Sequence, residues 1–143
     1  KLDDSWAAPF TVDGHRWQSV KHYVLGSQYK KSFPDFYLQF SLDTESELST
    51  NLEMAILATS KSGEYNDIKL RPDNVTVDAD FYSNVKFPRS EEERQKALEA
   101  KFTQNLDLQK ILKLTGRAKL TQFNRRNGAK VDMLLMKIRH SLA

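Results

Sequence analysis

The sequence predicts a mainly α-helical fold with small β additions, that is, an α-rich α+β domain. Its C-terminal half repeats apolar residues at the three- and four-residue spacing of amphipathic helices. Turn-forming Gly, Pro and Asp residues divide the N-terminal half into short segments. The length of 143 residues, 39% of them hydrophobic and 29% charged, suits one ordinary globular domain. We therefore expect a single domain over 1–143, and because the chain begins at Lys1 rather than Met, we expect residues upstream of it.

The N-terminal segment predicts a short β-hairpin that leads into a helix. Asp13-Gly14 is a turn signal between two short apolar stretches. Ser19 can cap the helix that follows, because a serine side chain accepts a hydrogen bond from a free backbone N–H of the first turn. Val20, Tyr23, Val24 and Ser27 are expected to lie on one face of this helix.

Two more helices and a strand are expected in the middle of the chain. A short helix starts at Pro34, and a longer one lies within 44–63 and stops at Gly63. Pro72 then blocks a helix, and the alternation around Thr76 predicts a short strand. The apolar residues behind these predictions are Phe36 and Phe40, then Leu48, Leu52, Ala55 and Ile56, and finally Val75 and Val77.

Three helices are expected in the C-terminal half. Ser90 and Glu93 have the spacing of a capping box, which would open a helix over 90–102. A second helix should end at Gly116. The third, over 131–142, has the strongest periodicity in the chain. The apolar positions of the three are Leu98 and Phe102; Leu108, Ile111 and Leu112; and Val131, Leu134, Leu135, Ile138 and Leu142.

The net charge of +3 conceals an uneven distribution along the chain. Residues 1–100 carry 12 Lys and Arg against 17 Asp and Glu, whereas residues 101–143 carry 10 against 2. A basic C-terminal region suits an anionic partner, which could be RNA, a nucleotide phosphate or an acidic protein surface. Alternatively, the basic region pairs with the acidic N-terminal part of the same domain. The sequence leaves both interpretations open.

Several kinds of chemistry are excluded by what the sequence lacks. Without cysteine there can be no disulfide, thiolate zinc site or cysteine nucleophile. The three histidines fit no metal-binding spacing, so we expect no metal and no cofactor. No apolar run approaches the roughly 18 residues of a membrane span, and nothing resembles a signal peptide. We therefore expect no membrane partner and a cytoplasmic location.

Several stretches together resemble a known family. "PFTVDGHRWQSVKHY" is similar to P-F-x-x-D-G-x-x-W-P-S/T-V-E-H-Y, and "ALEAKFTQN…LQKILKLTGRAKL" is similar to A-L-x-x-K-F-x-Q-N-x-x-L-x-x-x-L-L-x-T-G-D-A-x-L. With the closing "LLMKIR", they resemble the YbiA-like NADAR family over nearly the whole chain. The stretches "FYLQFSLD" and "LRPDNVTVDADFY" look most similar to the branch carried by large DNA viruses. The resemblance implies a mostly helical fold and cleavage of N-glycosidic bonds, in ADP-ribose attached to guanine or in ribosylamine intermediates of riboflavin synthesis.

The resemblance breaks at residues expected to do the chemistry. Lys21 stands where the family has the glutamate of V-E-H-Y. Cleavage of an N-glycosidic bond passes through a cationic, oxocarbenium-like state, which a carboxylate stabilises and an amine does not. The family's F-x-S-N-F stretch, its Q-A-Q-K stretch and its W-G-x-G loop are also replaced. Asp3, Asp4 or Glu99 could supply another acid in place of the missing one.

We therefore predict a catalytically degenerate domain that works by binding, and we assign no residue a catalytic role. The alternatives are an active N-glycosidase with a displaced acid, and a structural subunit of a larger assembly such as a viral one. The residues expected to form the ligand pocket are Arg16, Trp17, Lys21, His22, Gln28, Lys101, Gln104 and Asn105, of which Trp17 also suits the core. The basic patch expected to meet an anion, in and beside the loop that replaces the family's tryptophan loop, is Arg117, Lys119, Arg125, Arg126 and Lys130.

Overall fold

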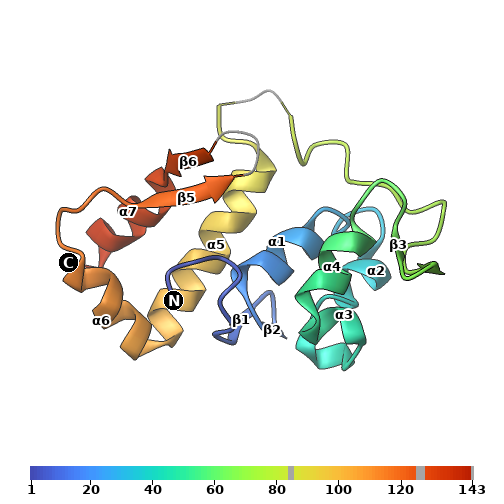
Figure 1. Cartoon of the computed structure of the whole chain (residues 1–143), viewed down its shortest axis with the longest axis horizontal. Coiled ribbons are helices and arrows are strands. Elements are labelled where there is room, and N and C mark those ends of the chain that lie inside the picture. The colour runs from blue at the N-terminus through green and yellow to red at the C-terminus, as the bar shows by residue number, and fades with distance from the viewer. Residues whose placement is uncertain (84–85, 125–127, 143) are drawn as a thin grey trace.

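The computed structural model describes residues 1–83, 86–124 and 128–142, and most of its regular structure is helical (Figure 1). The α-helices are α1 (Val20–Ser27), α2 (Pro34–Leu38), α3 (Glu47–Thr50), α4 (Leu52–Ala58), α5 (Arg89–Gln104), α6 (Leu106–Leu114) and α7 (Met133–Ser141), and a 3-10 turn, η1, covers Leu42–Thr44. None of the described helices has the length and apolar composition needed to cross a membrane.

The strands form three separate antiparallel pairs, each between neighbours in sequence. They are β1 (Phe10–Val12) with β2 (His15–Trp17), β3 (Glu64–Tyr65) with β4 (Ile68–Lys69), and β5 (Thr121–Asn124) with β6 (Gly128–Val131). Helices therefore dominate and the strands are small additions, which confirms the predicted α-rich α+β class.

Helix α5 is the element around which the others are arranged (Figure 1). It lies between α6, α7 and the β5–β6 pair on one side and α1 to α4 on the other, and it contacts α1, β1, α6 and α7. Its fully buried residues are Ala97, Leu98, Lys101 and Phe102, which lie on one side of the helix. The buried apolar side chains form one cluster to which all seven α-helices contribute.

The β1–β2 hairpin forms at the predicted turn. Asp13 and Gly14 both have positive φ, 56° and 77°, as the two-residue turn favoured by Asp-Gly requires. Gln104, at the end of α5, fixes the hairpin through its side-chain amide. The amide accepts a hydrogen bond from the N–H of Thr11 at 2.7 Å and donates one to the carbonyl of Thr11 at 2.9 Å. The hairpin is thus held by a helix far away in sequence.

Helix α1 begins at the predicted cap and takes part in a partly buried polar network. Ser19 Oγ accepts a hydrogen bond from a first-turn backbone N–H at 3.2 Å. One turn later, the Tyr23 hydroxyl lies 3.0 Å from a carboxylate oxygen of Asp13 and 2.9 Å from one of Glu93. The Lys30 amine pairs with the same two carboxylates at 2.5 and 2.8 Å. This network ties the hairpin turn to α1 and α5.

The prediction of one helix within 44–63 is wrong, because the chain forms α3 and α4 with a break at Asn51. Asn51 has extended backbone angles, and its side chain accepts a hydrogen bond from the N–H of Met54 at 3.1 Å. It caps α4, and asparagine favours a cap over the interior of a helix. Ile56, expected on the buried stripe, is 42% exposed. Gly63 lies beyond α4, in the turn before β3.

The predicted strand around Val75 is also wrong, since that segment has no regular structure. It is held instead by Asp78, which accepts hydrogen bonds from two backbone N–H groups after α1, at 3.0 and 3.1 Å, and from Arg89 at 2.7 Å. The strands of this region, β3 and β4, form just upstream, around a turn at residues 66 and 67 that both have positive φ.

Two of the C-terminal helices begin elsewhere than predicted. Helix α5 starts at Arg89, so Ser90 lies inside the helix and makes no side-chain cap. Glu93 is buried in the Tyr23 network rather than turned back in a capping box. Helix α7 starts at Met133, because the Asp132 side chain accepts the N–H of Leu135 at 3.1 Å and caps the helix there.

The region expected to be a loop before the last helix is the β5–β6 pair. Val131 belongs to β6 and is 37% exposed, instead of opening the last helix. The core positions Leu134, Leu135 and Ile138 are buried as the periodicity predicts.

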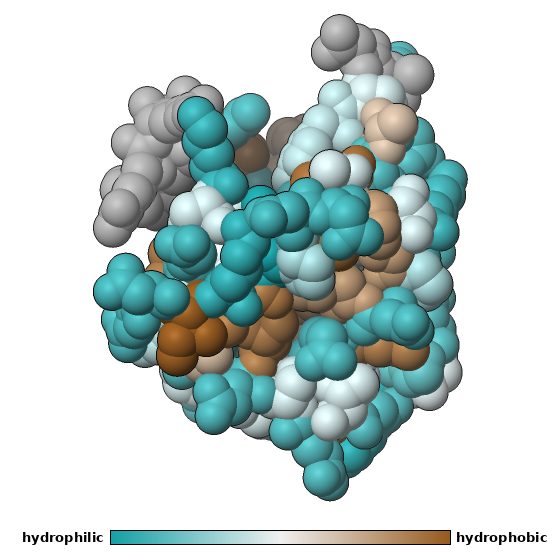
Figure 2. All heavy atoms as spheres, turned by 90° about the vertical axis from the view of Figure 1, so that its right-hand side faces the viewer, coloured by the Kyte–Doolittle hydropathy of each residue, from teal (hydrophilic) through white to brown (hydrophobic). Residues whose placement is uncertain are grey.

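One end of the molecule has an apolar face. Figure 2 shows apolar side chains gathered in the middle of this face, with hydrophilic side chains around them. The end is formed by α2, α3, α4 and the β3–β4 pair, and it contains a hollow of about 500 Å³ lined by residues that include Phe33, Pro34, Leu70 and Pro72. The charged cavities described below lie elsewhere.

Candidate functional site

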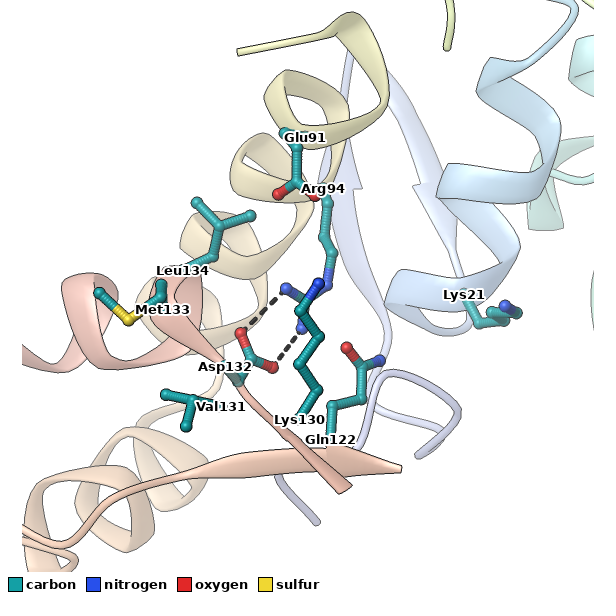
Figure 3. A pocket seen from close by; sticks show the side chains of 9 residues that line it. All are labelled: Lys21, Glu91, Arg94, Gln122, Lys130, Val131, Asp132, Met133 and Leu134. Carbon is teal, nitrogen blue, oxygen red and sulfur yellow. Dashed lines mark hydrogen bonds and ion pairs between the residues drawn. The ribbon is translucent and has the colours of Figure 1, made fainter. Parts of the chain in front are cut away.

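A cavity of about 460 Å³ lies where the start of α1, the first half of α5 and the β6–α7 junction meet (Figure 3). It is lined by Lys21, Glu91, Arg94, Gln122, Lys130, Val131, Asp132, Met133 and Leu134, and we call it the Lys21 cavity. Its volume is that of a small-molecule site, for which roughly 300–1,000 Å³ is usual. Of the residues expected to form the ligand pocket, the cavity is lined by Lys21, which stands where the NADAR motif has its glutamate.

One side of the Lys21 cavity is an arginine held between two carboxylates. Arg94 donates to both oxygens of Asp4, at 2.7 and 3.1 Å, and to both oxygens of Asp132, at 3.0 and 2.6 Å. Burial opposes the positive charge of Arg94, but the hydrogen bonds that it donates to Asp132 and Asp4 outweigh this effect, so the pKa of the guanidinium is raised above its ordinary value. The carboxylate oxygens on this side are therefore already engaged.

The remaining charges of the cavity belong to Lys21, Lys130 and Glu91. Within the described part of the chain, none of these three side chains has an oppositely charged group within 4.0 Å. Figure 3 shows Lys130 rising from β6 alongside the Arg94–Asp132 pair, whereas Lys21, on α1, lies apart from the other labelled side chains with its amine pointing away from them. The amines of Lys21 and Lys130 and the carboxylate of Glu91 are therefore available to bind a ligand.

The other walls of the cavity are polar or apolar but uncharged. Gln122 donates a hydrogen bond to Asp4 at 3.2 Å. Val131, Met133 and Leu134 supply apolar surface, and Met133 is 71% exposed. The first turn of α7 forms part of this wall, so the positive end of a helix dipole lies beside the cavity.

A solved structure has the same fold as this chain. The NMR structure of the E. coli protein YbiA matches 99% of this chain and 76% of that chain, with a TM-score of 0.65 and 23% sequence identity. This chain has the YbiA fold. The sequence matches no family model and no curated protein. The likeness bears on the fold, which is the fold that the resemblance to the NADAR motifs implies.

Within the YbiA fold, the expected pocket residues Trp17, His22 and Gln28 are buried and engaged internally, as is Lys101, described below. Trp17 is fully buried and donates to a backbone carbonyl of β1 at 3.0 Å. Gln28 donates to a carbonyl of α1 at 3.0 Å. His22 lies 2.8 Å from the Ser19 hydroxyl, and burial lowers the pKa of its imidazole to about 4. These three side chains hold the fold and do not line the Lys21 cavity.

The other expected pocket residues also lie outside the Lys21 cavity. Arg16 pairs with Asp43 at 3.1 Å, with 66% of its side chain exposed. Asn105 donates to the carbonyl of Lys101 at 2.9 Å and so closes the end of α5. Lys101 is fully buried and donates to a backbone carbonyl of the N-terminal segment at 2.9 Å. Gln104 is hydrogen-bonded to β1. Of the eight residues predicted for the pocket, Lys21 is thus the one that lines this cavity.

The residues of the predicted basic patch lie at several places. Lys130 lines the Lys21 cavity, which joins it to a residue predicted for the pocket. Arg117 lines a different hollow, between α6 and α7. Lys119 is exposed in the connection between α6 and β5. Arg125 and Arg126 lie outside the described residues.

Arg94 and Asp132, which form the ion pair on one side of the Lys21 cavity, were not predicted as site residues. Arg94 lies in an acidic, charged run that is typical of a solvated helix start. Arg94 precedes the buried Leu98 by four residues, which places both on the same side of α5. This spacing is the one feature of the sequence that indicates a buried position for Arg94. Among the described residues, no group of three or more His, Asp or Glu side chains could hold a metal ion.

Proposed function

We propose that the Lys21 cavity binds a nucleotide-like ligand without hydrolysing its N-glycosidic bond. The observation that carries the proposal is that Lys21 and Lys130 both line one cavity of small-molecule size. Two amines favour phosphate oxygens. Glu91 can accept hydrogen bonds from ribose hydroxyls, and Val131 and Met133 offer apolar contact to a base.

The charges of the cavity argue against N-glycosidase activity. A positive charge develops on the sugar as the bond breaks, and the Lys21 amine raises the energy of that state. Asp4, one of the acids that could have replaced the missing glutamate, has both oxygens on Arg94. Asp3 accepts a backbone N–H at 2.8 Å, and Glu99 accepts from Gln95 on an exposed side of α5. None of these three lines the Lys21 cavity.

A second candidate function, an active N-glycosidase, is favoured by Glu91. Glu91 lines the Lys21 cavity, and no cation among the described residues pairs with it. It could serve as a displaced acid or base, a role for which the sequence suggested other residues. The two candidates therefore differ in one measurable property, the release of ADP-ribose.

Binding and cleavage are tested on the same protein. Isothermal titration with ADP-ribose measures binding, and chromatography of an oligonucleotide carrying ADP-ribosylated guanine measures cleavage. We expect ADP-ribose to bind and no ADP-ribose to be released. Lys21→Ala and Lys130→Ala should each weaken binding about tenfold, the usual effect of removing one charge-assisted contact. Lys61→Ala, at an exposed lysine far from the cavity in sequence, should leave binding unchanged.

The outcomes separate the two functions. Release of ADP-ribose that Glu91→Gln abolishes would establish the glycosidase and reject the degenerate site. Lys21→Glu should not create activity, because the other family motifs of the pocket are also missing. Absence of ADP-ribose binding, or binding insensitive to Lys21→Ala, would reject the cavity as the ligand site.

Other features remain predictions. Membership of the branch carried by large DNA viruses rests on the stretches "FYLQFSLD" and "LRPDNVTVDADFY". A cytoplasmic location, a role as subunit of a larger complex, and RNA or an acidic protein surface as partner rest on composition and charge.

A further inference from the structure

A second charged hollow lies between the C-terminal end of α6 and the second half of α7. It has a volume of about 570 Å³ and is lined by Lys113, Gly116, Arg117, Met136, Arg139 and His140; we call it the α6–α7 concavity. It shares no lining residue with the Lys21 cavity. Three of its lining residues carry a permanent positive charge, and none carries a carboxylate.

Arg139 is held in place at this concavity by the fold itself. Its Nη1 atom donates to the Thr115 hydroxyl and to the carbonyl of Ala118, both at 2.8 Å. Within the described residues, its Nη2 and Nε atoms have no hydrogen-bond acceptor. A guanidinium fixed on one side with free donors on the other is suited to bind an oxyanion, because little entropy remains to be lost on binding.

The positive charge of the concavity exceeds what the helix ends require. Cations are common in the last turn of a helix, where they compensate a negative dipole of roughly half an elementary charge. Lys113 lies in the last turn of α6, and Arg139 and His140 lie in that of α7. The two ends together amount to roughly one negative charge, whereas Lys113, Arg117 and Arg139 supply three positive ones. Most of the positive charge of the concavity is therefore not compensated by the helix dipoles.

Ion pairs within the described part of the protein do not compensate this positive charge either. None of the carboxylates in the described ranges lies within 4.0 Å of Lys113, Arg117 or Arg139. Among the ion pairs of the described residues, the one that involves residues 101–143 is Arg94–Asp132, at the Lys21 cavity, and its C-terminal member is the carboxylate. At Gly116 the backbone faces open space, since no atom lies within 4 Å of where a Cβ would stand.

We propose that the α6–α7 concavity is a binding site for phosphate groups. Two sources share this chemistry: a free phosphorylated small molecule, and the phosphodiester chain of a single-stranded nucleic acid. The site is independent of the Lys21 cavity and does not require that cavity to bind a nucleotide. Lys113 and Arg117 are its exposed, adjustable contacts, and Arg139 is its fixed one.

The test uses sodium pyrophosphate and a short fluorescein-labelled oligouridylate as probes. Pyrophosphate is titrated into isotopically labelled protein, and amide NMR shifts are expected to gather at Gly116, Arg117 and Arg139. The oligouridylate is titrated by fluorescence polarisation at several salt concentrations. Binding of pyrophosphate alone identifies a small phosphorylated ligand. Binding of the oligonucleotide as well, with an affinity that falls by a slope of roughly −0.7 per phosphate contact, identifies a nucleic acid.

Matched variants decide whether these residues are responsible. The double variant Lys113→Ala/Arg117→Ala should lose at least about tenfold in affinity for whichever probe binds. Both positions are exposed, so its melting temperature should match that of the parent. Lys61→Ala, a substitution at another exposed lysine, should change neither the affinity for the probe nor the melting temperature. Neither probe binding, shifts centred outside the concavity, an unaffected double variant, or a polyglutamate peptide binding as tightly as pyrophosphate would each overturn the proposal.

Discussion

Lys101 is a lysine buried in the centre of the protein. Its side chain is fully shielded from solvent, and its Nζ atom donates to the backbone carbonyl of Asp3 at 2.9 Å. Burial lowers the pKa of the amine to about 8, against the opposing attraction of Asp4 and Asp3. The folded protein therefore holds this proton less firmly than the unfolded chain does.

This difference predicts that the protein becomes more stable as pH rises from about 8 to 10. In that window the unfolded chain binds a proton at Lys101 that the folded protein has released, so the free energy of unfolding increases with pH. The full gain is on the order of 3 kcal/mol, from the 2.5 units between about 8 and the ordinary 10.5. Urea unfolding at a series of pH values measures it.

Lys101→Met should flatten that rise, whereas Lys61→Met, at an exposed site, should retain it. The series should stop near pH 10, because Tyr23 and Tyr37 have raised pKa values, chiefly from burial, and reduce stability at higher pH. A parent protein whose stability is level between pH 8 and 10 would contradict the assignment.

At the scale of elements, α7 is attached through one apolar side. Leu134, Leu135 and Ile138 are buried, while Met133 on the same helix is 71% exposed. Leu135→Ala should lower the free energy of unfolding by about 2–5 kcal/mol, because it removes a packed side chain and leaves a cavity. Met133→Ala should change it by less than about 0.5 kcal/mol. Chemical denaturation of both variants measures the contrast, and equal losses would show that α7 is packed differently.

The sequence predicted the existence of most helices better than their ends. Apolar periodicity identified α5, α6 and α7 because each buries one side against the core. It could not show that Asn51 breaks a helix, since asparagine is tolerated inside helices as well as at caps. Ser90 and Glu93 had the spacing of a capping box, but Glu93 binds Tyr23 and Lys30 instead. Tertiary contacts outweighed the local signal at Glu93, whereas at Asn51 a local cap interrupted the helix.

The candidate site was predictable only in part for the same reason. Lys21 stood out because it replaces a glutamate in a recognisable motif. Its partner across the cavity, Lys130, was expected in a separate basic patch, and nothing local brings two such distant residues together. Arg94 and Asp132 become recognisable as a pair only once α5 and α7 are packed.

At the scale of the whole molecule, the Asp4–Arg94–Asp132 cluster joins the N-terminal segment, α5 and the start of α7. Breaking a buried ion pair from one side costs about 3–5 kcal/mol, since the remaining charge loses its partner. Asp4→Asn and Asp132→Asn should each destabilise the protein. The double variant should lose more than the sum of the two, because Arg94 then has no carboxylate from this cluster.

Urea unfolding of the two single variants and the double variant gives the coupling energy. Asp73→Asn is the matched control, because Asp73 pairs with Lys69 but is 89% exposed, and such pairs contribute at most about 1 kcal/mol. Strictly additive losses would mean that the two carboxylates act on Arg94 independently.

The hydrogen bonds between Gln104 and β1 have a consequence for folding during synthesis on the ribosome. The hydrogen bond between Thr11 and Gln104 joins residues 93 positions apart in sequence, and that between Asp4 and Arg94 joins residues 90 positions apart. During synthesis the hairpin emerges early with its aromatic side uncovered, and the helix that secures it is translated late. Contacts this distant in sequence form slowly, and uncovered apolar segments invite aggregation. The nascent N-terminal half should therefore depend on chaperones until α5 has left the exit tunnel, whereas the finished chain should not.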